Sequence, residues 1–275
     1  MRKPLPLGGV AANETDWEEN MSEALSGLLA GDVAVITGAA QGNGAAIALG
    51  LAASGASVIL CDVNDDGVRE QAERIGAAGG QARGFALDVT DRLACTEIAR
   101  EAEAAFGKVS ILVNNAGITR RTAPHEPDFL SHLDAQLDVN LQGMANMVVA
   151  FLGQLKATRG RIVNLGSIAS FVGYRNSASY AASKGGVLQL TKALACDLAA
   201  DGVRVNGIAP GVIVTPMTEG TRANPDAMAR FMGHTPMGRV GKPEELVGPV
   251  LFLASNLSSY VTGTMLPVDG GYLAN

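Results

Sequence analysis

The chain contains few of the residues that build disulfide frameworks or metal clusters. Its 275 residues include 3 Cys and 3 His, and aromatic residues make up 4%. The cysteines, at positions 61, 95 and 196, are far apart and form no Cys-x-x-Cys pair, so we expect neither disulfides nor a zinc site. The histidines are scattered as well, and we therefore expect no metal. This cysteine usage is typical of a reducing compartment, which favours a cytoplasmic protein.

Runs of basic residues and long apolar stretches are also missing. The 21 Lys and Arg residues are outnumbered by 27 Asp and Glu, and the net charge of −6 argues against nucleic acid as a partner. No stretch approaches the roughly 18 uncharged apolar residues that a membrane helix needs. Pro4, Pro6 and a cluster of acidic residues interrupt any signal-peptide pattern at the N-terminus.

Residues 1–28 precede the first regular pattern in the sequence. We predict a mobile N-terminal extension here, because chain ends are commonly unordered unless they are tied down. The alternative is an arm that docks on a neighbouring subunit through Trp17, the only Trp. We expect residues 29–275 to form a single domain, since neither a second boundary nor an internal repeat is visible.

From Asp32 onward, short β-rich runs alternate with longer Ala-rich stretches. Several runs are continuously apolar, which is typical of strands buried on both faces of a parallel sheet. The runs lie at 33–37, 57–61, 83–89, 110–117, 160–167, 203–211 and 264–271. This alternation predicts an α/β fold, a doubly wound Rossmann-like parallel sheet of about seven strands with helices on both faces.

A glycine-rich segment joins the first run to the first helical stretch. Glycine lets the backbone come close to a diphosphate, and a helix N-terminus offers free N–H groups and a positive dipole end. A glycine-rich turn alone is weak evidence, but its place at the first strand–helix junction strengthens it. The absence of a Gly-Lys-Ser/Thr ending disfavours a mononucleotide P-loop. The cofactor contacts expected here are Gly38, Gln41, Gly42, Asn43 and Gly44.

Asp62 ends the second run, about 20 residues beyond the glycine loop, where dinucleotide-binding folds place an acidic residue. Its carboxylate can accept hydrogen bonds from both adenosine ribose hydroxyls and would repel a 2′-phosphate. No Lys or Arg follows it directly. We therefore predict NAD as the cofactor, with NADP disfavoured. In the alternative, Asp62 only caps the turn that contains Asn64.

Tyr180 and Lys184 are spaced i, i+4, which places both on one face of a helix. A tyrosine phenol normally titrates near pH 10, so a base near neutrality needs its pKa lowered by about 2–3 units. A nearby ammonium group and an oxidised nicotinamide ring can supply the necessary positive charge. The pair therefore suggests a tyrosine acid/base, although this spacing alone is common by chance.

With other segments, the pair resembles a known family. The glycine loop, the Asn-Asn-Ala-Gly segment 114–117, Ser167, the Tyr-x-x-x-Lys pair and Pro210-Gly211 follow in the order seen in short-chain dehydrogenases/reductases, over about residues 30–275. The resemblance implies four catalytic residues: Asn140, Ser167, Tyr180 and Lys184. It implies that Ser167 and Tyr180 hold the substrate oxygen, that Lys184 also bonds the nicotinamide ribose, and that Asn140 positions a water in a proton relay.

The resemblance also implies further cofactor contacts. Those at the adenosine end are Asp88, Val89 and the segment that contains Asn115 and Gly117. Ile213 and Thr215, which follow the sixth run, are expected at the nicotinamide carboxamide, and Pro210 within that run is a further cofactor contact. Asn43 departs from the family pattern, which usually has an apolar residue there, so packing beside the nicotinamide is expected to differ.

A substrate lid is expected over residues 216–237, again from the resemblance. This segment holds four of the 9 Met residues and Phe231. These side chains can line an adaptable apolar pocket or only pack the lid on the body. Arg120 and Arg121 follow the fourth run near the expected mouth of the site. They could attract an anionic substrate or simply belong to a solvated loop.

We predict an oxidoreductase that transfers a hydride between NAD(H) and a secondary alcohol or ketone, with Tyr180 as general acid/base. Asp62 and the segment 234–255 favour sugars, polyols and similar small alcohols as substrates. One alternative is a 3-oxoacyl-thioester reductase that uses NADPH. A remote alternative is an NAD-binding sensor without chemistry. The resemblance also implies a homotetramer.

Overall fold

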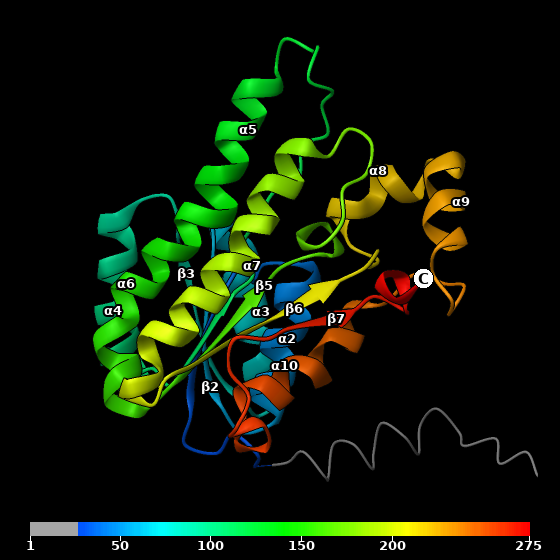
Figure 1. Ribbon diagram of the computed structural model, residues 1–275. Coiled ribbons are helices and arrows are strands. Elements are labelled where there is room, and N and C mark those ends of the chain that lie inside the picture. Colours follow the sequence, from blue (N-terminus) through cyan, green and yellow to red (C-terminus); the bar gives the residue numbers. More distant parts are fainter. Residues whose placement is uncertain (1–26) are drawn as a thin grey trace, which may run out of the picture.

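Seven parallel strands form one sheet in the computed structural model of the protein, which describes residues 27–275 (Figure 1). The strand order is β3-β2-β1-β4-β5-β6-β7, and every neighbouring pair is parallel. The doubly wound sheet predicted from the sequence is thereby confirmed. The strands are β1 (Val33–Thr37), β2 (Ser57–Asp62), β3 (Gln81–Ala86), β4 (Ile111–Asn114), β5 (Arg161–Leu165), β6 (Arg204–Pro210) and β7 (Met265–Val268).

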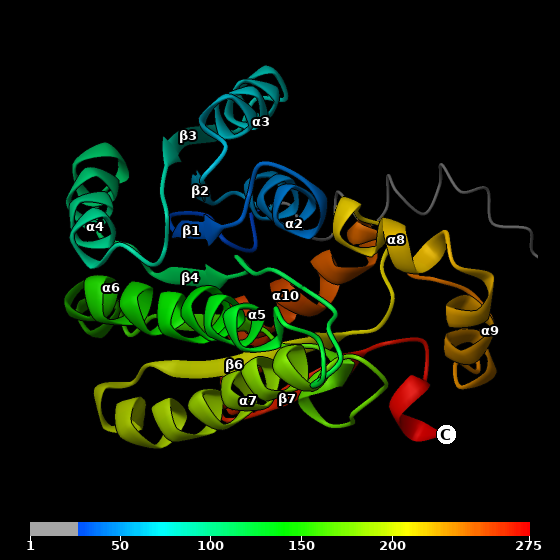
Figure 2. The ribbon, with the colours of Figure 1, turned by 90° about the horizontal axis from the view of Figure 1, so that it is seen from above.

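Helices cover both faces of this sheet (Figure 2). One face packs against α2, α3 and α10, and the other against α4, α6 and the end of α7. α5 packs on α7, and α8 and α9 lie beyond the carboxyl ends of the strands. The helices are α2 (Gly42–Ala53), α3 (Asp65–Ala77), α4 (Arg92–Phe106), α5 (Phe129–Leu137), α6 (Met144–Thr158), α7 (Ala178–Leu198), α8 (Glu219–Arg222), α9 (Pro225–Gly233) and α10 (Val247–Ala254).

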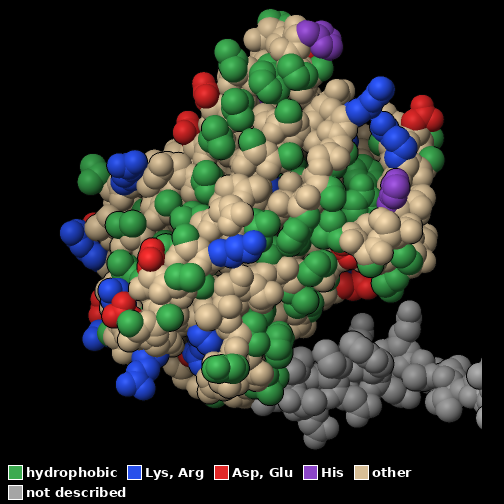
Figure 3. Space-filling view, in the orientation of Figure 1, with side chains coloured by type: hydrophobic (Ala, Val, Ile, Leu, Met, Phe, Trp, Pro, Cys, Tyr) green, Lys and Arg blue, Asp and Glu red, His purple; other side chains and the backbone are tan. Residues whose placement is uncertain are grey.

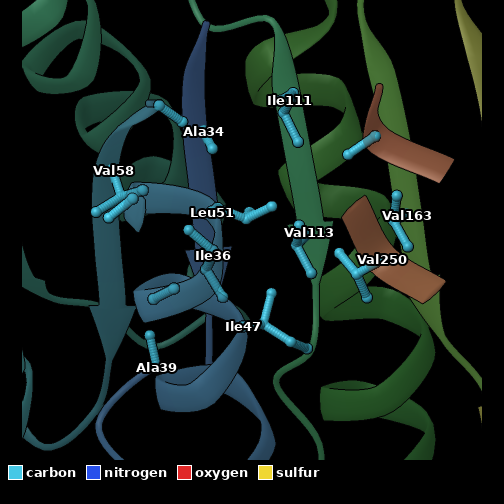
Figure 4. Packing of buried hydrophobic residues seen from close by; sticks show 14 of the residues in the cluster. Ala34, Ile36, Ala39, Ile47, Leu51, Val58, Ile111, Val113, Val163 and Val250 are labelled. Carbon is cyan, nitrogen blue, oxygen red and sulfur yellow. The ribbon is translucent and has the colours of Figure 1, made fainter. Parts of the chain in front are cut away.

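The central strand β1 contributes to two hydrophobic cores at once. Ala34 and Ile36 belong to the cluster under α2, whereas Val33 and Val35 belong to the cluster on the opposite face. Because both faces are covered, the whole strand is buried and its sequence is continuously apolar. Figure 4 shows the first cluster, with Leu51 of α2 reaching toward the strands.

The strands β3 to β7 all end earlier than the sequence pattern predicts, and β3, β4 and β7 do so by three residues. β3 ends at Ala86 rather than at position 89, because the Asp88 carboxylate accepts the N–H of Thr90 and turns the chain. β4 ends at Asn114, since the next two N–H groups donate to a side chain of β1 instead of to a strand. At both points the chain leaves the sheet at its carboxyl edge.

The strand order reverses between β1 and β4, and such a reversal opens a crevice at the carboxyl ends of the strands. A buried polar network crosses the sheet next to this crevice. Nδ2 of Asn114 donates to Oδ1 of Asn164 over 2.9 Å, and Nδ2 of Asn164 donates to Oγ1 of Thr191 over 2.9 Å. The network therefore ties β4 and β5 to α7.

The described fold begins close to the predicted domain boundary. Leu29 is fully buried, and its N–H donates to the carbonyl oxygen of Ser54 over 2.8 Å. Both expectations for residues 1–28 concern a segment of which residues 1–26 lie outside the described residues, so they stay predictions. Within residues 27–275, no helix is long and apolar enough to cross a membrane.

The packing of α2 on the sheet predicts a stability difference between two leucines. Leu51 is 0% exposed and Leu93 on α4 is 83% exposed. Leu51→Ala should lower the free energy of unfolding by about 2–5 kcal/mol, because it leaves a cavity in the core. Leu93→Ala should change it by less than about 0.5 kcal/mol. Urea unfolding followed by circular dichroism measures both, and equal effects would contradict this packing.

Candidate active site

A pocket of about 430 Å³ opens at the carboxyl ends of the strands. Most of the site residues predicted from the sequence line it: Gly38, Gln41, Gly42, Asn43, Asp62, Asp88, Val89, Asn115, Gly117, Ser167, Tyr180, Lys184, Pro210, Ile213 and Thr215. The other two, Gly44 and Asn140, lie behind the wall and contact residues that form it. The structure therefore brings all the predicted site residues together, although they come from six different strand ends and two helices.

Two glycines allow the glycine loop to pack closely against the end of β4. Gly38 has a φ of +65°, and a Cβ there would lie 2.9 Å from the Cα of Ala116. A Cβ on Gly44 would collide with the carbonyl oxygen of Gly38. A side chain at position 38 would push the glycine loop away from the segment after β4, and one at position 44 would push α2 away from the loop. The close approach of the helix N-terminus to the pocket therefore depends on these glycines.

The N-terminus of α2 keeps its N–H groups available to an anion. Gln41 is the N-cap residue, but its side chain makes no capping hydrogen bond, and the first turn has no acidic residue. In contrast, the side chains of Asn64 and Asp91 cap α3 and α4. These features fit the diphosphate of a dinucleotide.

A set of four hydrogen bonds fastens the glycine loop to the segment after β4. Oγ1 of Thr37 accepts the N–H of Asn115 over 3.1 Å and the N–H of Ala116 over 3.0 Å. Nδ2 of Asn115 donates to the carbonyl oxygens of Thr37 and Gly38, each over 2.9 Å. We call these four bonds the loop clamp. Asn115 is thus a bracing residue, and its predicted place beside the adenosine ribose stays a prediction.

Asp62 and Asp88 mark one end of the pocket, because β2 and β3 lie on one side of β1 while β5 and β6 lie beyond β4. Oδ2 of Asp62 accepts the N–H of Ala40 over 3.1 Å, and Oδ1 accepts the N–H of Asn64 over 3.0 Å. The turn-capping contact of the alternative interpretation is therefore present, and the same carboxylate also lines the pocket. No Lys or Arg among the described residues lines this end.

At the other end, Ser167 follows β5 and is fixed by its neighbours. Its Oγ accepts the N–H of Ala169 over 3.1 Å, and its N–H donates to Oγ of Ser170 over 3.2 Å. Oγ of Ser170 donates in turn to the carbonyl oxygen of Lys184 over 2.8 Å. Because Oγ of Ser167 already accepts a hydrogen bond, its own proton can be donated to a substrate oxygen.

Tyr180 and Lys184 both line this end from α7, as their i, i+4 spacing predicts. Lys184 is buried, and its Nζ donates to the carbonyl oxygen of Leu165 over 2.6 Å. Nζ lies 6.0 Å from the centre of the Tyr180 ring. The ammonium is therefore held between the end of β5 and the tyrosine.

Burial dominates the ionisation of both groups. It raises the pKa of the Tyr180 phenol, while a hydrogen bond with Ser167 and the positive charge of Arg121 act in the opposite direction. Burial lowers the pKa of Lys184 from 10.5 to about 8. Each group alone is thus disfavoured in its charged form, but a phenolate and an ammonium side by side would favour one another.

Asn140 lies in a π-helical segment, η1 (Asp138–Gly143), between α5 and α6. Its Oδ1 accepts the N–H of Ile118 over 2.7 Å, and its Nδ2 donates to the Ile118 carbonyl over 3.0 Å and to Oγ of Ser183 over 2.9 Å. Ser183 donates to the carbonyl oxygen of Tyr180. Asn140 thereby holds the segment after β4 against α7, and its role in a water relay stays a prediction. Single π-helical turns are frequent at functional sites.

Reasoning from the sequence missed the polar residues that hold the site from outside, namely Thr37, Gln136 and Ser183. Gln136 had a visible signal, because it precedes Asn140 by four residues in a helical stretch and so shares a face with it. Thr37 and Ser183 had none, since a threonine that ends a strand and a serine inside a helix are common. The apolar wall contributed by Leu87, Ile118 and Leu165 was not identified either, whereas Met217, which also lines the pocket, belongs to the predicted lid.

Comparison with known proteins places the chain in a family. A family model described as enoyl-(acyl carrier protein) reductase matches residues 38–273. The chain belongs to the short-chain dehydrogenase/reductase family. It is accordingly an oxidoreductase that acts on CH–OH groups, and the resemblance seen in the sequence is confirmed.

Several relatives within this family cover nearly the whole chain. It is 45% identical over 248 residues to galactitol 2-dehydrogenase (L-tagatose-forming) of Cereibacter sphaeroides, covering 89% of this chain and 96% of that protein. It is 41% identical over 251 residues to 3-oxoacyl-[acyl-carrier-protein] reductase of Thermotoga maritima, covering 88% and 98%.

A solved structure is also similar over its whole length. The gluconate 5-dehydrogenase of Burkholderia cenocepacia, in complex with NADP and tartrate, is 36% identical with a TM-score of 0.86, covering 92% of this chain and 99% of that one. A nicotinamide nucleotide as cofactor of this family is thus supported, while the comparison does not favour NAD over NADP.

The buried lysine predicts an unusual dependence of stability on pH. Its folded-state pKa of about 8 lies below the usual 10.5, so its charge destabilises the fold below pH 8, and this destabilisation disappears as the pH rises toward 10.5. A lowering of this size corresponds to about 3 kcal/mol at pH 7. Losing the bond to Leu165 costs about 1 kcal/mol. Lys184→Met should therefore stabilise the dinucleotide-free protein at pH 7, with a gain that shrinks above pH 8.

Urea unfolding at pH 7 and again near pH 10 measures this difference. Lys192→Met is the matched control, because Lys192 is exposed on the same helix. A Lys184→Met protein that is less stable than wild type at pH 7, or a gain that is independent of pH, would contradict the expected cost of the buried ammonium.

Proposed function

We propose that the protein is an NAD-dependent dehydrogenase of a secondary alcohol, in the class of sugars, polyols and similar small hydroxy compounds. The observation that carries the proposal is one continuous pocket with two distinct ends. Ser167, Tyr180 and Lys184 line one end, and Asp62 lines the other. A dinucleotide that spans the pocket would have its adenosine at Asp62 and its reactive ring at Tyr180.

In the proposed mechanism, Tyr180 is the general base for alcohol oxidation and the general acid for ketone reduction. The hydroxyl of Ser167 donates a hydrogen bond to the substrate oxygen and holds that oxygen against the Tyr180 phenol. Lys184 supplies the positive charge that lowers the pKa of the phenol when the substrate proton is taken. A bound nicotinamide dinucleotide would supply the hydride acceptor for this oxidation. Asn140 keeps the wall at Ile118 and the helix of Tyr180 in register.

The residues predicted to contact the dinucleotide are divided between three groups. Gly38, Gln41, Gly42 and Asn43, with Gly44 behind them, would take the diphosphate at the N-terminus of α2. Asp62, Asp88, Val89, Asn115 and Gly117 would border the adenosine. Lys184, Pro210, Ile213 and Thr215 would hold the nicotinamide end together with Tyr180.

The choice of NAD rests on charge at the adenosine end. Two carboxylates, Asp62 and Asp88, line it, and no cation there is available to a 2′-phosphate among the described lining residues. The Burkholderia relative binds NADP, so the choice of dinucleotide has to be argued for this chain separately. The two hydrogen bonds that Asp62 accepts leave lone pairs on both oxygens for ribose hydroxyls.

The 41% identity to a 3-oxoacyl-[acyl-carrier-protein] reductase favours the NADPH-dependent reductase as a second candidate. The carboxylates at the adenosine end argue against it. The complete set of Asn140, Ser167, Tyr180 and Lys184 and the membership in an oxidoreductase family argue against the non-enzymatic sensor.

We also propose a homotetramer in the cytoplasm. The tetramer rests on the family resemblance and on large apolar side chains that are exposed in the single chain, such as Val149 at 73% and Leu257 at 64%. The location rests on the cysteine usage, because the three cysteines of the described chain are unpaired.

Tyr180→Phe tests the proposed chemistry. It removes the proton-transferring oxygen and leaves the ring, so turnover across a panel of polyols and hydroxy compounds should fall by about 10²- to 10⁴-fold. Affinity for NADH, measured by fluorescence titration, should be unchanged. Tyr260→Phe is the matched control, since Tyr260 is fully exposed. Undiminished turnover in Tyr180→Phe would exclude Tyr180 as the acid/base.

A further inference from the structure

A second cavity, of about 60 Å³, adjoins the catalytic end of the main pocket. Ser167 and Tyr180 line both cavities, so the smaller one extends from the reacting atoms away from the dinucleotide. Its walls are formed by the loop after β4, the loop after β5 and the lid. Arg121 is the only charged residue on those walls.

The guanidinium of Arg121 lies within cation–π distance of two aromatic rings that also contact each other. Its central carbon lies 5.5 Å from the ring centre of Tyr174 and 6.0 Å from that of Phe231. Tyr174 and Phe231 also meet each other edge to face at 5.6 Å, and Phe231 contacts Tyr272 at 5.9 Å. The cation is therefore seated on an aromatic cluster that joins the lid to the body. Figure 3 shows hydrophobic side chains gathered between the lid, on the right of the view, and the rest of the molecule.

The backbone on both sides of Arg121 is fixed by buried polar groups. Gln136, which is 0% exposed, accepts the N–H of Arg120 over 3.0 Å and donates to the hydroxyl of Ser179 over 2.8 Å. On the other side, the hydroxyl of Thr122 hydrogen-bonds Nδ1 of His132 over 2.9 Å. These contacts anchor the loop to α5 and to the residue that precedes Tyr180 on α7. Arg121 itself is exposed, so the anchored backbone holds an accessible cation at the cavity.

Cation–π attraction to a ring does not use up the N–H donors of a guanidinium, which form a planar fork. Within residues 27–275, no carboxylate forms a salt bridge with Arg121. A substrate carboxylate matches this fork, because two parallel N–H···O bonds can form. The rings also keep the cation in one orientation, which reduces the entropy lost on binding.

We infer that Arg121 binds a carboxylate of the substrate, so that the protein acts on hydroxy-carboxylates in preference to uncharged polyols. This inference rests on the proposed function, since it places the carboxylate on the side of the reacting carbon opposite the dinucleotide. The hydroxyl to be oxidised lies between Ser167 and Tyr180, and the acid group lies at Arg121. The inference therefore gives the two arginines different roles. The side chain of Arg121 binds the substrate, whereas Arg120 contributes only its backbone N–H.

A competing explanation is that Arg121 only fastens the lid through Phe231. The two explanations differ in what they predict for uncharged ligands. A lid-fastening residue would affect acids and their uncharged analogues equally, whereas a carboxylate-binding residue affects the acids alone.

The test is calorimetric titration of the full chain, in complex with the reduced dinucleotide that it binds (NADH or NADPH), with gluconate and with gluconamide. The reduced dinucleotide prevents oxidation of the ligand, so binding is measured without chemistry. Gluconate should bind about 10- to 100-fold more tightly than its uncharged isostere. The same comparison with 4-hydroxycyclohexanecarboxylate and its carboxamide tests a ring skeleton.

Arg121→Gln should abolish the preference for the acid and leave binding of the amide unchanged. Arg121→Lys keeps the charge but loses the fork, so it should retain only part of the preference. Arg120→Gln is the matched control, because its side chain lines neither cavity. It should behave as wild type.

Two results would overturn the inference: neither acid binds more tightly than its amide, or Arg121→Gln weakens both members of a pair equally. Either result leaves the proposed function standing if Tyr180-dependent oxidation of an uncharged polyol is observed. Conversely, a chain that binds the acids through Arg121 but oxidises no alcohol would contradict the proposed function and not this inference.

Discussion

The loop clamp between Thr37 and the segment after β4 is the interaction on which the rest of the site depends. It lies where the strand order reverses, and it holds the glycine loop against Asn115 and Ala116 with four hydrogen bonds. Positions 38 and 44 require glycine, because a Cβ at either one would break this contact. The clamp thus fixes the floor of the pocket and aims the uncapped N-terminus of α2 at it. Without it, the adenosine end and the catalytic end would not share one cavity.

From that floor, a continuous set of polar contacts leads to the chemistry. Asn140 joins the segment after β4 to Ser183 on α7, and Ser170 joins Ser167 to the backbone of Lys184. Asn140, Ser167 and Lys184 are each held by a partner outside the reaction, as a preorganised site requires. The fold buries the charge of Lys184 against a single carbonyl oxygen. The folded protein therefore keeps a charged group that lowers its stability. In the proposed reaction this charge lowers the pKa of the Tyr180 phenol.

Much of this arrangement was predictable, because parallel sheets place their ligand-binding residues at the carboxyl ends of the strands. The apolar runs predicted all seven strands, and Gly38, Asp62, Ser167 and Pro210 each follow or end one of them. The sequence did not reveal which loops and helices contact one another when they are far apart along the chain. The contacts of Arg121 with Tyr174 and Phe231 join two loops and α9, and the anchoring by Gln136 depends on how α5 meets α7. Strand ends were misplaced where a side chain, at Asp88 or Thr37, replaced a backbone partner.

The central claim is that one pocket holds a nicotinamide dinucleotide with its adenosine ribose at Asp62. The most direct measurement is fluorescence titration of wild type, Asp62→Ala and the exposed control Asp66→Ala with NADH and with NADPH. We expect wild type and the control to bind NADH at least about tenfold more tightly than NADPH, because a carboxylate repels the 2′-phosphate. Asp62→Ala should bring the two affinities close together. Tighter binding of NADPH by the wild-type protein would contradict the account and would favour the 3-oxoacyl-thioester reductase instead.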